Sequence, residues 1–345
     1  MLGNFDLIPN PITQNGNSIQ TIAFKCTVCG KCCNSAPLMT LPELFHHENL
    51  FVGSLAVRRI RRHKAGETLS AANVQYMISA EEGALLAELA ESQLYQPASG
   101  HNQQDYDFSL MTQAMDYESG NQCPALAANY HCTLQNDRKP IVCSMVPFDS
   151  LYPDSLQNIV LMNRGYRENC ISSQPQDDLD IVIRHRQLVD RQYAAALQQR
   201  RNDLVMEKQL WGAEVFAQLE QEFFYHPAMA EKIPTDNGLL CLSIIPVLTI
   251  VAGISENCRL RCLQYIDSQL KLIDSKINQA ISRKSAQDKP VTAEFRGFKE
   301  KYQKFRLLLS AHRPDTNLAN ADSLTDSRIM ALESYLGISP IGQCR

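Results

Sequence analysis

The stretch Phe24-Lys25-Cys26-Thr27-Val28-Cys29-Gly30-Lys31-Cys32-Cys33 places four cysteines within eight consecutive positions. Two-residue spacing lets a short turn direct two thiolates at one metal ion, which is why this spacing recurs in zinc and iron–sulfur sites. Gly30 suits a tight turn with a positive φ, in which backbone N–H groups face a bound centre. Because consecutive side chains diverge, we expect Cys32 and Cys33 to serve different ions, or different iron atoms of one cluster.

Four more cysteines follow at long range, and the resulting eight thiols suffice for two four-thiolate zinc sites or for an iron–sulfur cluster with thiols to spare. The alternative is that they are ordinary buried cysteines, because free cysteine packs as a small hydrophobic side chain. The Gly and Lys neighbours in the first motif argue against that alternative. We therefore predict these metal ligands: Cys26, Cys29, Cys32, Cys33, Cys123, Cys132, Cys143 and Cys170.

The residue types around these cysteines favour an iron–sulfur cluster over zinc. Thiolates suit both Zn²⁺ and iron clusters, so the ligand type does not fix the metal. No histidine stands at a paired spacing, although zinc sites often include histidine. Positive charges that could offset an anionic thiolate cluster are interleaved with the cysteines: Lys25, Lys31, Arg138, Lys139 and Arg167. A four-thiolate zinc site needs no histidine either, and zinc stays open as the alternative.

Composition places the chain among ordinary globular proteins. It has 345 residues, 44% hydrophobic and 20% charged, and a formal net charge of −4, which excludes a generally basic nucleic-acid-binding surface. The N-terminus lacks the basic start and apolar run of a secretory signal. The longest uncharged apolar stretch, residues 239–254, is shorter than the ~20 residues that a membrane-spanning helix needs. We expect a cytoplasmic protein, in which clustered thiols indicate metal or redox chemistry rather than disulfides.

Helical patterns dominate the second half of the chain, and the predicted fold is mainly α. We expect an irregular, metal-organised domain over residues 1–175, with a helical insertion at about 48–115, and an α-helical domain over 176–345. After a capping serine, Ser255, one apolar stripe runs at spacings of three and four through Cys258 and Cys262 to Ile281. A second stripe runs from Phe295 to Leu309, and a last short helix is expected around 323–336.

Local signals place further helices in the first half. Thr40 and Glu43 form the capping box of a helix that follows the cysteine motif, and Ser79 and Glu82 form another. The basic run Arg58–Lys64 is interpreted as a solvated helix face, in preference to a nucleic-acid or acidic-partner site.

Other residues with metal-binding chemistry receive weaker interpretations. Cys258 and Cys262 could present two ligands from one helix, but their place on the apolar stripe predicts a core role, as does the apolar run around Cys241. Cys344, next to the C-terminus, is left without an assignment. Three histidines are minor candidates for a ligand or proton-relay role, since each follows or adjoins a cysteine motif: His46, His47 and His131.

The cysteine pattern resembles that of the YkgJ-type cysteine-cluster family, a zinc- or iron-chelating domain. The opening Phe24–Cys33, followed by the helix start at Thr40, looks like the family's first motif. The later matches are Cys123-Pro124-Ala125-Leu126, Cys132, the Arg138 to Cys143 step and Val146-Pro147-Phe148, with Cys170 as the closing cysteine. This chain departs from the family by inserting Lys139 between Arg138 and Pro140. The resemblance does not cover the C-terminal half.

The resemblance implies a metal- or cluster-binding domain, and it relates the chain to flagellin lysine methylases, which share the cysteine cluster. Protein-lysine methylation with S-adenosylmethionine is therefore an alternative function. The sequence shows no Gly-rich strand–helix turn for a conventional methyl-donor site, and the C-x3-C-x2-C spacing of radical S-adenosylmethionine enzymes is missing. Two classes remain open: a redox or protein-modifying enzyme, and a non-catalytic structural-zinc module that presents its helical half to a protein partner.

Overall fold

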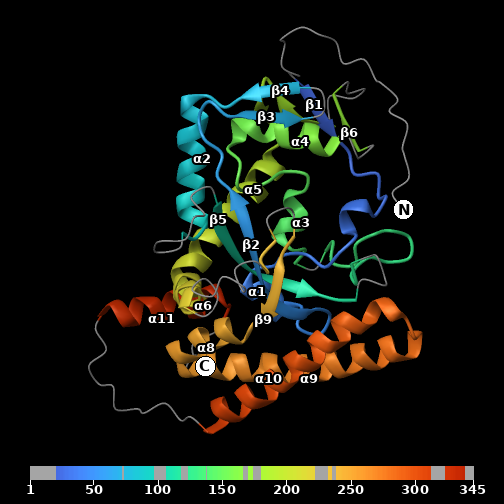
Figure 1. Cartoon of the computed structure of the whole chain (residues 1–345), viewed down its shortest axis with the longest axis vertical. Helices are drawn as coiled ribbons and strands as arrows, with labels where there is room; N and C mark the ends of the chain where they lie inside the picture. Colours follow the sequence, from blue (N-terminus) through green and yellow to red (C-terminus); the bar gives the residue numbers. More distant parts are fainter. Residues whose placement is uncertain are drawn as a thin grey trace, which may run out of the picture.

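Helices predominate in the structure, and the mainly-α prediction is confirmed at this coarse level. The structure is a computed structural model, shown in Figure 1. It describes residues 21–71, 74–96, 106–117, 123–136, 138–165, 170–173, 180–221, 232–234, 238–311 and 323–338. Strands occupy several segments for which the sequence predicts helix. Strands also adjoin the first cysteine motif and Cys170.

A three-stranded antiparallel sheet runs through the middle of the molecule (Figure 1). Strand β2 (Val52–Arg61) pairs along its whole length with β5 (Tyr106–Met115), and its other edge pairs with β9 (Leu240–Ser243). The prediction of helix for this segment, including the basic run Arg58–Lys64, is wrong. All residues from Val52 to Val57 are buried, and a strand buried on both faces lacks the alternation of apolar and polar residues by which a strand is recognised in a sequence.

Two smaller sheets flank the cysteine motif and the predicted insertion. Strands β6 (Ile171–Ser172), β1 (Thr21–Phe24), β7 (Ile181–Arg184) and β8 (Gln187–Leu188) form one sheet in that order, and β3 (Thr68–Ala71) pairs with β4 (Val74–Met77). Within the predicted helical insertion, only α2 (Ala80–Gln93) among the described residues is helical. Its capping box at Ser79 and Glu82 forms as predicted, with backbone and side-chain bonds in both directions.

The C-terminal helices form as the apolar stripes predict. Cys258, Cys262 and the later stripe residue Ile273 are fully buried, and so are Phe295 and Tyr302 of the second stripe. Residues 239–254 divide into β9 and a helix, and the helix after residue 191 continues through a π-helical segment at Lys208–Gly212. The helices are α1 (Leu41–His46), α3 (Ile141–Met145), α4 (Gln157–Gly165), α5 (Arg191–Glu207), α6 (Ala213–Leu219), α8 (Ile245–Ile254), α9 (Glu256–Arg283), α10 (Lys289–Ala311) and α11 (Ser323–Tyr335).

Two clusters of buried side chains support these elements. The larger one joins both halves of the chain, because Phe51 of the N-terminal half packs in the same cluster as Trp211, Tyr265 and Phe295. The smaller cluster, around Phe148, includes buried side chains of the four-stranded sheet and of α4. The division at residues 175 and 176 stays a prediction, although the two parts share one core. Among the described residues, no helix combines the length and apolar character of a membrane span.

Candidate metal centre

The first cysteine motif begins where strand β1 ends, and a neighbouring strand brings a distant cysteine beside it. Phe24 of β1 is paired with Ile171 of β6. At the next position, the Lys25 N–H donates to the Cys170 carbonyl over 2.9 Å. Pairing of the two strands therefore places Cys170 next to Cys26, across almost half the chain. The role of Cys170 as the closing cysteine of a metal site stays a prediction.

Gly30 shapes the turn between the second and third cysteines of the motif. Its φ of 74° is the positive value that the sequence predicts, and its carbonyl accepts from the Cys33 N–H over 2.9 Å. A Cβ at this position would lie 2.8 Å from Cδ1 of Tyr130 and 3.3 Å from Leu126. Glycine is therefore required for two reasons, the left-handed conformation and the close approach of the second cysteine loop.

Four cysteines from three segments gather beside this turn, and we name them the inner thiol group: Cys33, Cys123, Cys132 and Cys143. The Cys123 N–H donates to the Cys33 carbonyl over 2.8 Å, which fixes the second loop against the first. Leu126 forms an isolated bridge with Cys132, so Cys123 and Cys132 lie on one narrow loop. Cys143 lies on the short helix α3 (Figure 1). The inner thiols are partly buried, and all four are free.

The inner thiols repel one another when ionised. The pKa of Cys33 is raised far above its usual value, first by its hydrogen bond with Cys32 and by burial, then by the charges of Cys32, Cys143 and Cys123. Burial, with the charge of Cys123 second, raises the pKa of Cys143 to about 12, while Lys139 acts in the opposite direction. The pKa of Cys123 is raised by burial and, to a smaller extent, by Cys132. Such mutual repulsion is what a bound cation relieves, because coordination deprotonates thiols outright.

A second set, which we name the outer thiol group, acts electrostatically on the phenol of Tyr193 on α5: Cys26, Cys32 and Cys170. Burial raises the pKa of Tyr193 to about 12, with smaller contributions from Asp190 and from these three cysteines. Cys26 and Cys32 are exposed, and so is Cys29, which lies in the same loop. Cys32 also contacts Cys33 through a side-chain hydrogen bond, so the two thiol groups meet at this adjacent pair, and the division of Cys32 and Cys33 between different ions stays a prediction.

Glu43 links the helix after the first motif to the helix that carries Cys143. As predicted, it closes the capping box of α1: its Oε2 accepts from the Thr40 N–H over 2.8 Å. Its other oxygen, Oε1, accepts from the N–H of Ile141, the first residue of α3, over 2.6 Å. The capping box was visible in the sequence, but this second role was not, because Ile141 lies 98 residues away.

The other candidates divide between core and surface roles. Cys258 and Cys262 are fully buried, which confirms the core prediction, and Cys241 is partly buried in β9. His47 is buried and its Nε2 donates to the Arg138 carbonyl over 3.0 Å, so this nitrogen supports the 138–140 turn. His131 is exposed beside Cys132. Cys344 and Arg167 lie outside the described residues.

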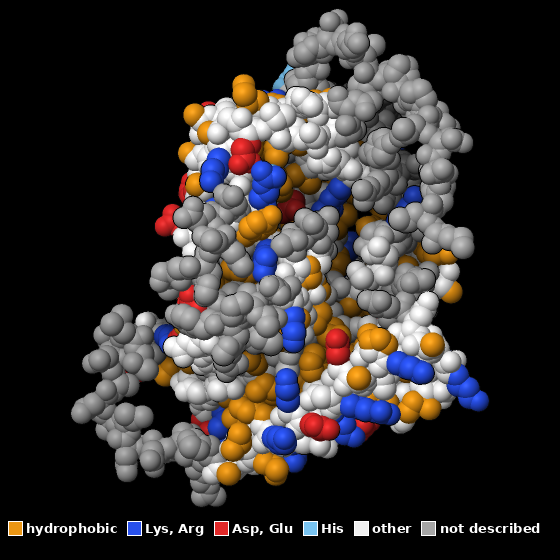
Figure 2. Space-filling view, in the orientation of Figure 1, with side chains coloured by type: hydrophobic (Ala, Val, Ile, Leu, Met, Phe, Trp, Pro, Cys, Tyr) orange, Lys and Arg blue, Asp and Glu red, His pale blue; other side chains and the backbone are white. Residues whose placement is uncertain are grey.

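Basic side chains are numerous on the face shown in Figure 2, where blue atoms lie over the lower helices α9 and α10. On helices α9 and α10, three lysines and arginines are paired with carboxylates: Lys276 with Asp116, Lys299 with Asp274 and Arg306 with Asp267. In the predicted basic run, Arg62 is paired with the buried Asp107. These pairs neutralise much of the positive charge, and they give no support to a nucleic-acid interface.

Among the described residues, no group of three His, Cys, Asp or Glu side chains has the close geometry of an assembled metal site. The inner and outer thiol groups are neighbours through backbone contacts and through their charges. In comparisons with known proteins, no family model, no curated protein and no solved structure matches this chain.

Proposed function

We propose that this protein binds metal through two four-thiolate sites, with iron–sulfur clusters preferred over Zn²⁺. The inner thiol group would form one site, and the outer thiol group together with Cys29 would form the second. The observation that carries the proposal is the convergence of Cys33, Cys123, Cys132 and Cys143 from three separate segments. Free thiols with raised pKa values gain nothing from lying together, whereas a shared cation makes their proximity favourable.

The chemistry of the surroundings supports a metal-loaded state. None of the eight described cysteines is joined in a disulfide. Lys139 opposes the raised pKa of Cys143, and a cluster with several thiolates would benefit from such a nearby positive charge. The loops that carry the cysteines have little regular structure of their own, and structural metal sites contribute folding energy in such segments. Bound iron–sulfur clusters would supply electron transfer or redox sensing, and zinc would supply a structural clip.

Anaerobic purification followed by iron, zinc and sulfide analysis tests the proposal. Brown protein with acid-labile sulfide is the expected result, and it would remove the structural-zinc alternative. Colourless protein with about two zinc ions would instead support the non-catalytic interaction module. Protein that takes up neither metal after anaerobic reconstitution would overturn the proposal altogether.

Separate replacement of the two adjacent cysteines tests the division into two sites. We expect Cys33→Ser to lose the metal of the inner site and Cys32→Ser to lose that of the outer site, each with about half of the total retained, since each site has its own four thiolates. Cys258→Ser is the matched control, because its thiol is buried on α9 and should leave the metal content unchanged. Equal loss of all metal from both variants would contradict independent sites.

Protein-lysine methylation is the alternative that the sequence resemblance implies. It is tested by calorimetric titration of the reconstituted protein with S-adenosylmethionine. Saturable binding would favour an enzyme, and undetectable binding would count against the methylase alternative without affecting the metal proposal.

A further inference from the structure

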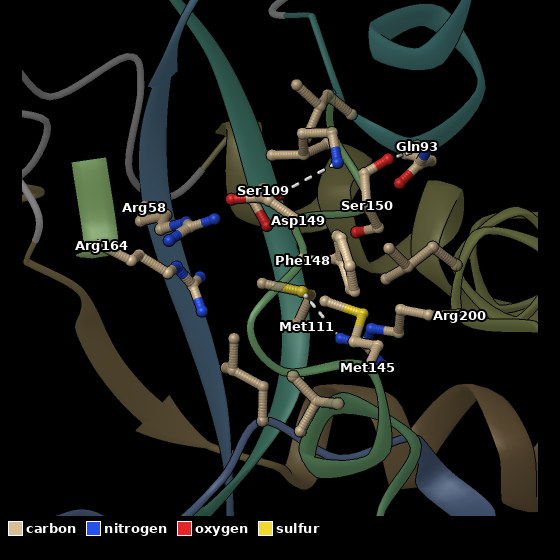
Figure 3. Close-up of a pocket in the computed structure, with 15 residues that line it drawn as sticks. Arg58, Gln93, Ser109, Met111, Met145, Phe148, Asp149, Ser150, Arg164 and Arg200 are labelled. Atoms are coloured by element: carbon tan, nitrogen blue, oxygen red, sulfur yellow. Dashed lines mark hydrogen bonds between the residues drawn. The ribbon is translucent and has the colours of Figure 1, made fainter. Parts of the chain in front are cut away.

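A cavity of about 140 Å³ lies between the central sheet and the helices α3, α4 and α5, close to the inner thiol group. Figure 3 shows its lining, with Arg58 and Arg164 extending from one side and Arg200 from the other. Apolar side chains, among them Met145 and Phe148, form much of the wall between them. The lining residues come from seven separate segments of the chain, and no local sequence pattern predicts this combination.

Arg200 is the most unusual residue of the cavity, because it is a charged side chain that is only 2% exposed. It lies on the buried stripe of α5, between Leu197 and Leu204. Its Nη2 donates to the Met111 sulfur over 3.2 Å, and its Nη1 finds no hydrogen-bond partner. A buried guanidinium without a carboxylate in contact is strongly unfavourable, since buried charges are normally paired.

Glu207, an acid on the same helix, does not supply a full negative charge to balance Arg200. Glu207 is fully buried, and burial raises its pKa to about 8, in spite of the opposing effects of the Leu41 N–H and of Arg200. Most of this carboxyl group is therefore neutral at pH 7. Asp203, the other acid of α5 that interacts electrostatically with Arg200, accepts a hydrogen bond from the Gln199 side chain and forms no ion pair with Arg200 among the described residues. A negative charge from outside the chain would complete the environment of Arg200.

The remaining polar groups give the cavity a positive balance. Its lining contains three arginines and one acid, Asp149, whose Oδ1 accepts from the Leu151 N–H over 3.0 Å. The Nε of Arg58 is buried and also lacks a hydrogen-bond partner. Arginine presents its donors as a planar fork that matches carboxylate and phosphate oxygens. The cavity thus offers unsatisfied donors from two sides, above an apolar wall.

We propose that this cavity binds a small organic carboxylate. The carboxylate group would receive hydrogen bonds from Arg200 and Arg58, and the apolar part of the ligand would pack against Met145 and Phe148. The volume suits such a ligand, since a cavity of about 150 Å³ accommodates one benzene ring. Inorganic phosphate could satisfy the arginines, but it would leave the apolar wall unused.

The cavity and the inner thiol group share one element, the short helix α3. Val142 and Met145 line the cavity, whereas Cys143 between them belongs to the inner thiol group. Helix α3 would therefore separate a bound carboxylate from the proposed metal. The ligand site itself does not depend on the metal, because none of its polar groups is a cysteine.

Calorimetric titration of the purified protein with hexanoate and phenylacetate tests the proposal. Their uncharged counterparts, hexanamide and phenylacetamide, are the matched ligands, and inorganic phosphate is the third arm. We expect saturable binding of at least one carboxylate and affinity for its amide that is lower by about tenfold or more, since hydrogen bonds to charged groups are the strong ones. Equal binding of acid and amide, binding of phosphate alone, or no binding of either carboxylate would overturn the proposal.

Substitutions then identify the groups responsible. Arg200→Met should weaken carboxylate binding by about 100-fold without lowering the unfolding temperature, because it removes a buried charge that lacks a partner. Arg58→Gln should weaken binding by about tenfold and is informative even if the first variant fails to fold. Arg191→Gln, an exposed arginine on the same helix, is the matched control and should bind as the parent does. Unchanged carboxylate affinity in Arg58→Gln, or in a folded Arg200→Met variant, would contradict the assignment.

The metal-depleted Cys33→Ser variant separates this inference from the proposed function. We expect it to retain carboxylate binding within about threefold, since the arginines lie outside the thiol group. Loss of binding in this variant, with the cavity residues intact, would show that the site requires the metal centre and would contradict an independent ligand site.

Discussion

The inner thiol group and the thiols of α9 show the same residue in two opposite environments. Cys258 and Cys262 are fully buried on a 28-residue helix, among apolar side chains that pack regardless of any ligand. The inner thiols stand on loops and on a five-residue helix, where they are partly exposed and close to one another. Packing explains the first pair completely. In the second set the pKa values of Cys33, Cys123 and Cys143 are raised, partly by the charges of neighbouring thiols, and this mutual repulsion is the basis of the proposed metal site.

Removal of metal should give the largest difference between these regions. Structural zinc sites contribute an apparent ~10–16 kcal/mol, so stripping reconstituted protein with a strong chelator should unfold the loops around residues 25–33 and 123–143. Helices α9 and α10 should keep their structure, because their apolar stripes are buried without it. Hydrogen exchange resolved by segment measures both at once. If the amides of the cysteine loops keep the same protection from hydrogen exchange after metal removal, the metal does not hold these loops, and the predicted difference between them and the helices is wrong.

Glu207 of α5 holds the helix that follows the first cysteine motif, because its Oε1 accepts from the Leu41 N–H over 2.6 Å at the start of α1. Burial raises its pKa from 4.5 to about 8, so between these values the unfolded chain loses a proton that the folded protein keeps. Stability should therefore fall as the pH rises through this window, by up to a few kcal/mol. Glu207→Gln should make the protein more stable than the parent at pH 8.5 and flatten this decline.

Urea unfolding of both proteins at pH 5, 7 and 8.5 provides the measurement. The two should converge at low pH, where Glu207 is protonated in the folded and, increasingly, in the unfolded state. Parallel stability curves across the range would contradict the raised pKa. Exposed Glu214→Gln is a suitable control, since it should leave the pH dependence unchanged.

Glu43 should couple helix capping to metal affinity. Glu43→Ala removes the acceptors of the Thr40 and Ile141 N–H groups, which should cost about 1–2 kcal/mol. Because Ile141 begins the helix that carries Cys143, metal affinity of the inner site should also fall by about 10–100-fold, as for other groups that orient metal ligands. Competition with a chromogenic chelator measures the affinity.

The control for this variant is Ser255→Ala, which removes the N-terminal cap of α9, the helix that carries the buried Cys258 and Cys262. It should lower stability by a similar amount and leave metal affinity unchanged. Equal metal affinity in Glu43→Ala and the parent would show that α3 is positioned without Glu43.

The smallest expected effect belongs to the buried thiols. Cys262→Ala should cost about 1 kcal/mol, the usual range for a small truncation in a core, and should retain all bound metal. Cys143→Ala should instead lose the inner metal. Denaturant unfolding and metal analysis of the same samples give both quantities, and metal loss from Cys262→Ala would break the distinction between the two kinds of cysteine.

Some features of the site follow from local sequence. The positive φ of Gly30 and the capping boxes at Thr40 and Ser79 depend on neighbouring residues only, and all three are confirmed. The core positions of Cys258 and Cys262 follow from helical periodicity. By contrast, the prediction of helix over 52–61 is wrong because residues 52–57 of β2 are all buried, and a strand buried on both faces lacks the alternation of apolar and polar residues by which a strand is recognised.

The sequence by itself therefore determined which cysteines have loop surroundings and which have core surroundings, because flanking residues and periodicity are local properties. Only the tertiary structure decided that Cys33 lies near Cys123 and Cys143, and that Cys170 lies beside the first cysteine motif. It also placed Arg200 at the cavity. Contacts across a hundred residues depend on strand pairing and packing, which no local pattern specifies.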